Sequence, residues 1–475
     1  MAAGGGLWNR RSEAGGRPPT RFLITLGAFG GASIIDSFLA VTDTEVSPQV
    51  GATLNVFPRN EVVASLDHPF RGVNRTAAPF FGETYVGNQG AFIDAHHGNM
   101  LVATQTGTSV NHTLGQQRSI TGNGAWNGRT LQEAVSIHHG EGFPLPNVTM
   151  GALGFREDGA DDSVPAWARA HSISDPQRWP LSLDGLHGID DAPTRDVLEI
   201  ARSVRDQSLD PHTRFTRTFL LSERLEAWKR MRGEDVPRLE NAGLLEKLNF
   251  GLDDPSLPPF DPADRAALDA AFGHLTVDPL QMQAAMAYLL IKNGLSVAVT
   301  LSPTWNVETN PDATGEEHRI INTPLSFDYS HTQHRHTQTM MWRRMLNTLD
   351  PLIALLRGAQ HPEAPGESLF DHTVIYVATD FGRTKNRPEG SLGFGTGHGL
   401  NNGNLLLSGN LLAGGTLLGG VDPSTALTYG YDPLSGAPMP GTEMPERVMY
   451  SGILQALDVD RSGSGLPAVP AMLPA

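Results

Sequence analysis

Short apolar runs alternate with longer amphipathic stretches along most of the chain, which is typical of an α/β protein. The apolar runs predict buried strands, because parallel strands covered on both faces read as nearly continuous hydrophobic segments. These predicted strands are Arg21–Leu26, Asn99–Thr104, Leu295–Leu301, Thr373–Thr379 and Leu405–Leu407. Helical spacing of apolar residues predicts the helices Leu280–Lys292, Gln338–Leu356 and Met444–Leu457, and a helix start within Asn111–Ile120. The alternation predicts a doubly wound, mostly parallel sheet flanked by helices.

Composition divides the chain into a leader, one large domain and a tail. Residues 1–20 are rich in Gly and Arg and predict a disordered leader, whereas the Gly- and Pro-rich residues 461–475 predict a flexible tail. Residues 21–460 form the predicted α/β domain. Within it, residues 158–275 are rich in Asp, Arg, Glu and Pro, and they predict a helical insertion that caps the site. The helices expected in this cap are Thr194–Ser208 and Thr216–Arg232.

The formal net charge of −16 and the absence of Cys each exclude some functions. A chain this acidic lacks the excess of basic residues that binds nucleic acid, so we expect no nucleic-acid partner. Without Cys there are no disulfides, thiolate zinc ligands or Cys nucleophiles. The apolar stretch Phe22–Ala40 follows Arg10 and Arg11, as in an export signal, but it contains three Gly and Asp36. We therefore interpret it as a buried strand with a Gly loop, and we expect no integral membrane segment.

Two segments near the predicted strands and helices carry residues suited to metal binding. Asp328, His331, His334 and His336 fall within nine residues just before a helix. Carboxylate and imidazole ligands together suit zinc best, with manganese or calcium as alternatives, although His-rich loops are also common as solvated turns. In the second segment, His398 lies between two glycines, so the backbone there can approach a ligand closely.

A third segment places Asp380 directly after the predicted strand Thr373–Thr379, followed by Gly382 and Arg383. In open α/β sheets, functional residues collect at the carboxyl ends of the strands. Capping of a helix is the simpler alternative role for Asp380. All three segments fall within about seventy residues, and this clustering favours a functional site over packing alone.

The order of these motifs resembles the bacterial family known as domain of unknown function 1501, which is related to alkaline phosphatases and sulfatases. The resemblance covers most of the chain and is weakest over residues 158–275. It rests on the strand and Gly loop at 22–33, the "NHT…ITG" segment at 111–122, "GLSVAVTL" at 294–301, "FDYSHTQH" at 327–334, "VATDFGRT" at 377–384 and "GHG" at 397–399. It implies an alkaline-phosphatase-like fold.

The same resemblance implies a hydroxyl nucleophile at the head of a helix. Thr108 fits this position, because it stands four residues before His112 and shortly before a Thr-Gly pair. The adjacent Ser109 is the alternative nucleophile, and a helix N-cap is the simpler role for Thr108. By the same likeness, His112 would assist catalysis, while Asn111 and Arg383 would bind substrate.

The resemblance also implies one or two divalent ions. Asp328, His331 and His398 would hold one ion, and Asp380 would face a second together with Thr108. The Asp that the family carries after its first strand is Ser33 here, so the second site lacks a ligand unless Asp36 supplies it.

The resemblance favours a metal-dependent hydrolase of phosphate or sulfate esters that uses a Thr nucleophile on a small or polymeric substrate. Because of the missing ligand, the alternative is a catalytically degenerate relative that acts as a binding or structural protein at the cell surface. The family resemblance implies that the protein is exported to the periplasm or outside the cell, and a cytoplasmic location is the alternative.

Overall fold

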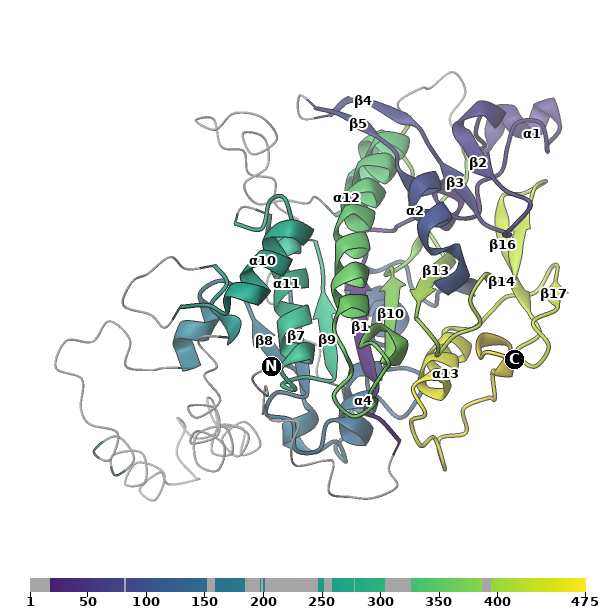
Figure 1. The fold of residues 1–475 in the computed structure, drawn as a ribbon. Helices are drawn as coiled ribbons and strands as arrows, with labels where there is room; N and C mark the ends of the chain where they lie inside the picture. The colour runs from purple at the N-terminus through teal and green to yellow at the C-terminus, as the bar shows by residue number, and fades with distance from the viewer. Residues whose placement is uncertain are drawn as a thin grey trace, which may run out of the picture.

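A computed structural model describes residues 18–80, 83–151, 159–183, 247–251, 259–276, 278–303, 326–386 and 394–475, together with the single residues 197 and 200. Its centre is an eight-stranded sheet in the order β14-β6-β13-β10-β1-β9-β7-β8 (Figure 1). Within this sheet β13 alone runs antiparallel to its neighbours β10 and β6. The predicted α/β architecture with a mostly parallel sheet is therefore confirmed.

The strands of this sheet come from the whole length of the chain. In chain order they are β1 (Phe22–Gly27), β6 (Met100–Thr106), β7 (Asn147–Met150), β8 (His171–Ile173), β9 (Ala298–Leu301), β10 (Thr373–Ala378), β13 (Asn401–Leu407) and β14 (Thr416–Leu418). Strand β1 pairs in parallel with both β10 and β9, and all six of its residues are buried. This double burial explains why the first strand is apolar at nearly every position, with Thr25 as the one polar side chain.

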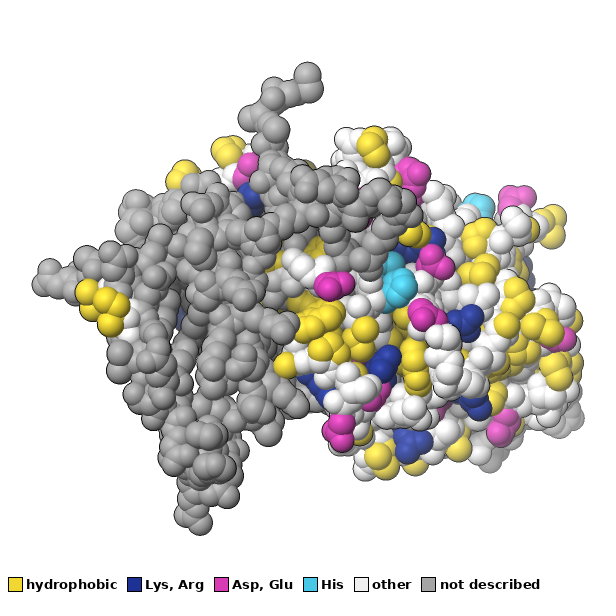
Figure 2. All heavy atoms as spheres, turned by 90° about the horizontal axis from the view of Figure 1, so that it is seen from below, with side chains coloured by type: hydrophobic (Ala, Val, Ile, Leu, Met, Phe, Trp, Pro, Cys, Tyr) yellow, Lys and Arg dark blue, Asp and Glu magenta, His cyan; other side chains and the backbone are white. Residues whose placement is uncertain are grey.

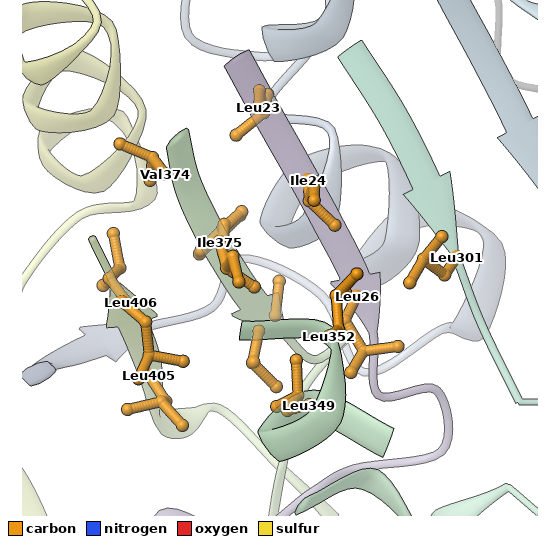
Figure 3. Close-up of a cluster of buried hydrophobic side chains, with 14 of the residues drawn as sticks. Leu23, Ile24, Leu26, Leu301, Leu349, Leu352, Val374, Ile375, Leu405 and Leu406 are labelled. Carbon is orange, nitrogen blue, oxygen red and sulfur yellow. The ribbon is translucent and has the colours of Figure 1, made fainter. Parts of the chain in front are cut away.

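Eight α-helices are described, and all of them except α1 contribute buried residues. They are α1 (Pro48–Thr53), α2 (Gln89–His96), α3 (His112–Gly115), α4 (Leu131–His139), α10 (Pro262–Ala271), α11 (Pro279–Lys292), α12 (Ser330–Gly358) and α13 (Glu446–Ala456). Figure 3 shows one part of the core, where Leu349 and Leu352 of α12 join Leu26 of β1 and Ile375 of β10 in the same buried cluster. Burial of such side chains stabilises each by about 1.5–3 kcal/mol relative to an exposed position.

The remaining described strands form small separate sheets of two or three strands. They pair β2 (Val62–Ala64) with β3 (Arg71–Val73), β4 (Thr76–Phe80) with β5 (Glu83–Val86), β11 (Gly382–Arg383) with β12 (His398–Gly399), and β16 (Leu427–Tyr431) with β15 (Gly420–Asp422) and β17 (Pro438–Met439). The β11–β12 pair matters most for function, because its register sets Arg383 opposite His398.

Some predicted boundaries differ from the structure. Helix α12 begins at Ser330 rather than at Gln338, so it includes the His-rich segment. Strand β9 begins only at Ala298, because Gly294 adopts φ +70° as the helix C-cap and the next residues complete that turn. The helix expected within Asn111–Ile120 is one α-turn, α3, followed by a π-turn.

The predicted insertion and leader lie partly outside the described residues. The helices expected at 194–208 and 216–232 fall there, apart from residues 197 and 200, and so do residues 1–17 of the leader. Of the part that is described, β8 is an edge strand of the central sheet, parallel to β7. The segment after residue 158 therefore starts as a continuation of the sheet rather than as a separate helical cap.

The end of the chain differs from the expected flexible tail. Val469 and Met472 have no exposed surface and belong to the main hydrophobic cluster. The amide of Val469 also donates a hydrogen bond of 2.9 Å to Gln455 in α13. The segment is therefore held against the core by Val469 and Met472, although its Gly and Pro content is typical of a loop.

Charged groups are mixed on the surface. On the described part of the face in Figure 2, acidic and basic side chains are interspersed with hydrophobic ones. Among the described residues, no helix combines the length and apolar character needed to span a bilayer.

The packing of Met472 gives a stability test. We expect Met472→Ala to lower the free energy of unfolding by about 2–4 kcal/mol, because it leaves a cavity against α13. Met439→Ala is the matched control: this side chain is 42% exposed, and the expected change is within about 0.5 kcal/mol. Urea denaturation measures both. Equal stability of Met472→Ala and the wild type would mean that residues 461–475 are not part of the core.

Candidate metal centre

The loops that carry the candidate site meet at one edge of the central sheet. Strands β1, β10 and β6 point the same way, so the segments that follow them emerge at the same edge. These segments contain Gly30, Asp380 and His112 respectively. Strand β13 runs in the opposite direction, so His398, which precedes it, also lies at this edge. Topology thus gathers groups from segments up to 350 residues apart.

Three imidazoles surround one carboxylate oxygen. Asp328 Oδ1 lies 3.5 Å from His112 Nε2, 3.3 Å from His331 Nε2 and 3.5 Å from His398 Nε2. The ligand atoms of His112, Asp328 and His398 all lie within 4.8 Å of one another, so this group could hold a metal ion. With bonds of about 2.0–2.2 Å, the ligands of a tetrahedral zinc ion stand about 3.3–3.5 Å apart. The distances from Asp328 match this spacing.

The hydrogen bonds of two imidazoles orient their Nε2 atoms toward the cluster. His398 Nδ1 lies 2.8 Å from the carbonyl oxygen of Val110, and His112 Nδ1 lies 2.9 Å from Asp380 Oδ2. Both partners accept hydrogen bonds, so each neutral ring carries its proton on Nδ1 and a lone pair on Nε2. Ligand histidines in metal sites are usually held in this way. The hydrogen bond to Asp380 raises the pKa of His112, although burial opposes the shift.

Asp380, which the resemblance places beside a second ion, has a carboxylate that is bonded to three neighbouring groups. Its carboxylate is fully buried, and Oδ1 accepts hydrogen bonds from the amides of Gly30 (3.0 Å) and Gly31 (2.9 Å). The other oxygen is bonded to His112. Both oxygens are therefore engaged, and Asp380 orients the ring of His112.

Gly30 is needed for this arrangement. Its φ of +89° is a conformation that residues with a Cβ rarely adopt, and a Cβ at this position would collide with the backbone nitrogen of Asp328. The Gly-Gly loop can thus approach the start of α12 closely while it donates its amides to Asp380.

Arg383, which the resemblance implies would bind substrate, is buried and bonded within the protein. Its guanidinium has no exposed side-chain surface and donates to Asp328 Oδ1 (3.0 Å). It also donates to the carbonyl oxygens of Gly30, Phe327 and Thr396. Burial lowers the pKa of Arg383, while Asp328 opposes this shift. The side chain joins the three loops of the site.

His331 is the most exposed member of the cluster, at 45% of its side-chain surface. Its Nε2 lies 2.8 Å from Nε2 of His398, a hydrogen-bond distance, so one of the two rings must donate a proton to the other. Burial and the nearby Arg383 lower the pKa of His331, which favours the neutral ring. A kink at Gln333 (φ −140°, ψ 77°) separates His331 from the histidines that follow it in α12.

Asp36 lies in a different network and does not complete a second metal site. Its Oδ2 is 2.8 Å from Nε2 of the buried His334, and its Oδ1 accepts a hydrogen bond of 2.7 Å from Asn55. Burial alone would raise the pKa of Asp36, but the charge and hydrogen bond of His334 outweigh it and lower the pKa to about 2. The remaining residue of the His-rich segment, His336, bonds only locally to Gln333 among the described contacts.

Lys385 adds a buried cation to this network. Its ammonium has no hydrogen-bond partner among the described residues, and burial lowers its pKa to about 8, although the charge of Asp36 opposes the shift. Arg335 joins the same network, because its Nε donates a hydrogen bond of 3.0 Å to Asn55 Oδ1. No local motif marks Asp36, Lys385 and His334 as a group, because they come together only in the fold.

The predicted nucleophile is held by a residue that the sequence did not indicate. Thr108 is exposed, and its hydroxyl donates a hydrogen bond of 3.0 Å to Glu446 Oε2 at the start of α13. Its amide donates to Glu446 Oε1 at 3.1 Å. Ser109 accepts a hydrogen bond from the amide of Asn111, and the Asn111 side chain caps α3 by accepting from Leu114. Asn111 thus caps α3, and its predicted contact with substrate stays a prediction.

Comparison with known proteins adds no assignment: no model of a protein family matches the chain, and a search of curated proteins finds no significant match.

The Asp36 network predicts a defined response to acid. The pKa of Asp36 is lowered from 3.8 to about 2 in the folded state. Its stabilising contribution, about 2 kcal/mol, is therefore complete above about pH 4 and is lost as the pH falls through 2. We expect Asp36→Asn to flatten the loss of stability between pH 4 and 2.

Asp36→Asn should also lower the free energy of unfolding by about 3 kcal/mol at pH 7, because His334 and Lys385 lose their only carboxylate among the described contacts. Urea denaturation at pH 7, 4, 3 and 2 measures both effects. Asp94→Asn, at an exposed position of α2, is the control. Similar curves for the two variants at every pH would show that the Asp36 network does not stabilise the fold.

Proposed function

We propose that the protein is a single-ion, metal-dependent hydrolase of phosphate or sulfate esters, with zinc as the preferred ion, on an alkaline-phosphatase-like fold. The observation that carries the proposal is the convergence of His112 Nε2, Asp328 Oδ1 and His398 Nε2, with both histidines oriented by their Nδ1 partners. His331 is a fourth candidate ligand. The ester class is supported by the motif resemblance.

The donor set fits a zinc ion in an accessible site. Two or three imidazoles and a carboxylate are common ligands of catalytic zinc, which keeps one position for substrate or water. The side chains of His112, Asp328 and His398 remain 33%, 30% and 21% exposed, so small molecules can reach them. A purely structural zinc site would be closed by four buried ligands. A bound ion would act as a Lewis acid that polarises the ester group.

The residues of the chain have distinct roles in the proposed reaction. Thr108 supplies Oγ1 as the nucleophile, and Glu446 Oε2 accepts its proton through the hydrogen bond seen in the structure. The new bond joins Oγ1 to phosphorus or sulfur as the bond to the ester oxygen breaks, and the departing oxygen takes up the proton that Glu446 accepted. Water then attacks the same phosphorus or sulfur, gives its proton to Glu446 and displaces Oγ1, which takes up that proton, so phosphate or sulfate leaves and Thr108 is restored. Asp380 keeps His112 oriented throughout, and Arg383 keeps Asp328 in place.

A catalytically degenerate relative that binds a ligand at the cell surface or in the periplasm is the second candidate. The observation that favours it is the engagement of Asp36 by His334 and Asn55, which leaves a single candidate ion site among the described residues. Under either candidate we propose a periplasmic or extracellular location.

The metal site can be tested without an activity assay. After removal of metals by chelation and titration with zinc, calorimetry should show about one tight site. Asp328→Asn and His398→Ala should abolish it, and Asp380→Asn should weaken the affinity about 10–100-fold, because His112 loses its orienting partner. His97→Ala, at a half-buried position that the cluster does not include, should change nothing. Absence of zinc binding by the wild type would remove the basis of the hydrolase.

The nucleophile is tested by a pair of adjacent variants. With zinc-loaded protein and p-nitrophenyl phosphate or sulfate as substrate, Thr108→Ala should lower kcat at least about 100-fold, because the attacking oxygen is lost. Ser109→Ala is the control, and its kcat should stay within about threefold of the wild type. Calorimetry should give both variants the zinc affinity of the wild type. If Ser109→Ala loses activity and Thr108→Ala keeps it, the nucleophile is Ser109.

A further inference from the structure

Exposed apolar side chains cluster around the candidate metal ligands. Four of the eleven large hydrophobic side chains that are exposed in the described residues lie within two positions of His112, Asp328 or His398. They are Val110 (43% exposed), Leu114 (46%), Tyr329 (41%) and Leu400 (42%). Exposed apolar groups are common one at a time, but their concentration at a site indicates an interaction surface.

Backbone hydrogen bonds bring two of these residues together. The carbonyl oxygen of Val110 accepts the hydrogen bond from His398 Nδ1, and the carbonyl oxygen of Leu400 accepts one of 2.8 Å from the amide of Gly107. The segments 107–112 and 398–400 therefore lie side by side at the site. Val110 and Leu400 stand at the outer, solvent-facing part of the two segments that supply His112 and His398.

The inner wall of the site is apolar as well. The buried ring of Phe381 stacks on His398 with centroids 3.9 Å apart and an interplanar angle of 29°. It also contacts His112, with centroids 4.8 Å apart. The two histidine ligands thus pack on a buried aromatic ring, and exposed aliphatic residues lie next to them in the chain.

We infer that the substrate carries an apolar alkyl or aryl group next to the ester, with the charged head at His112, Asp328 and His398 and the apolar group on Val110 and Leu400. This inference rests on the proposed hydrolase and specifies its substrate class. Sugar and nucleotide esters, whose alcohol part is polar, would leave the exposed aliphatic side chains in water. An alkyl or aryl group removes them from water, and each buried methylene strengthens binding about fourfold.

Binding of n-alkylphosphonates, which have the charged head but no ester bond to cleave, tests the inference independently of catalysis. The zinc-loaded full chain is titrated by calorimetry with methyl-, butyl- and octylphosphonate. We expect the affinity to rise at least about tenfold from the methyl to the octyl compound. In Val110→Ser and Leu400→Ser this gain should shrink at least about threefold, while the affinity for methylphosphonate and for zinc stays unchanged.

Leu434→Ser is the matched control, because Leu434 is 66% exposed and lies in the β16–β17 loop, away in sequence from every candidate ligand. It should bind all three phosphonates like the wild type. Equal affinity for methyl- and octylphosphonate, or an equal loss of the gain in Leu434→Ser, overturns the inference.

The proposed function fails in a different way. If alkylphosphonates show the expected gain but the zinc-loaded protein releases neither phosphate from octyl phosphate nor sulfate from octyl sulfate, the apolar surface stands and the hydrolase does not. Release from methyl and octyl esters at equal kcat/KM, without a gain in phosphonate affinity, supports the hydrolase and contradicts the apolar surface.

Discussion

The buried carboxylate of Asp380 is the interaction on which the site depends. It stands just beyond the end of β10, where one oxygen accepts the amides of Gly30 and Gly31 and the other bonds to His112. A buried carboxylate without such donors would be costly, so the loop after β1 and the loop after β6 are fixed together around it. Substituting Gly30 would disturb this arrangement because Asp328 packs directly against it. The hydrogen bonds that Asp380 accepts thus hold His112 and the Gly30–Gly31 loop in the positions that form the cluster.

Two polar networks lie close in the chain but serve different ends. The kink at Gln333 divides them: His331 joins His398 and Asp328, while His334 pairs with Asp36 behind them. The first network is accessible and has oriented lone pairs, which suits a metal and a substrate. The second network is buried. In it Asp36 pairs with His334 and lies near the ammonium of Lys385. This division is why the described residues offer a site for one ion, although the resemblance allows two.

Local pattern accounts for most of the sheet and for three of the four candidate ligands. The strand expected at Arg21–Leu26 is β1, and that at Thr373–Thr379 is β10, because strands buried on both faces need continuous apolar sequence. Asp328, His331 and His398 were recognised by residue type and spacing, and the fold does gather them. The Asp380–His112 bond, the Glu446 partner of Thr108 and the burial of Met472 had no such signal, since each joins segments that a local pattern cannot relate.

The sequence by itself determined the α/β class, the order of the main elements and the kinds of side chain available for chemistry, since these follow from apolar periodicity and residue type. The tertiary structure decided which of those side chains meet. It made His112 a ligand candidate, turned Asp380 and Arg383 into positioning residues and withdrew Asp36 into a buried pair with His334. The physical reason is that hydrogen bonding and burial act between atoms that are close in space, whatever their separation along the chain.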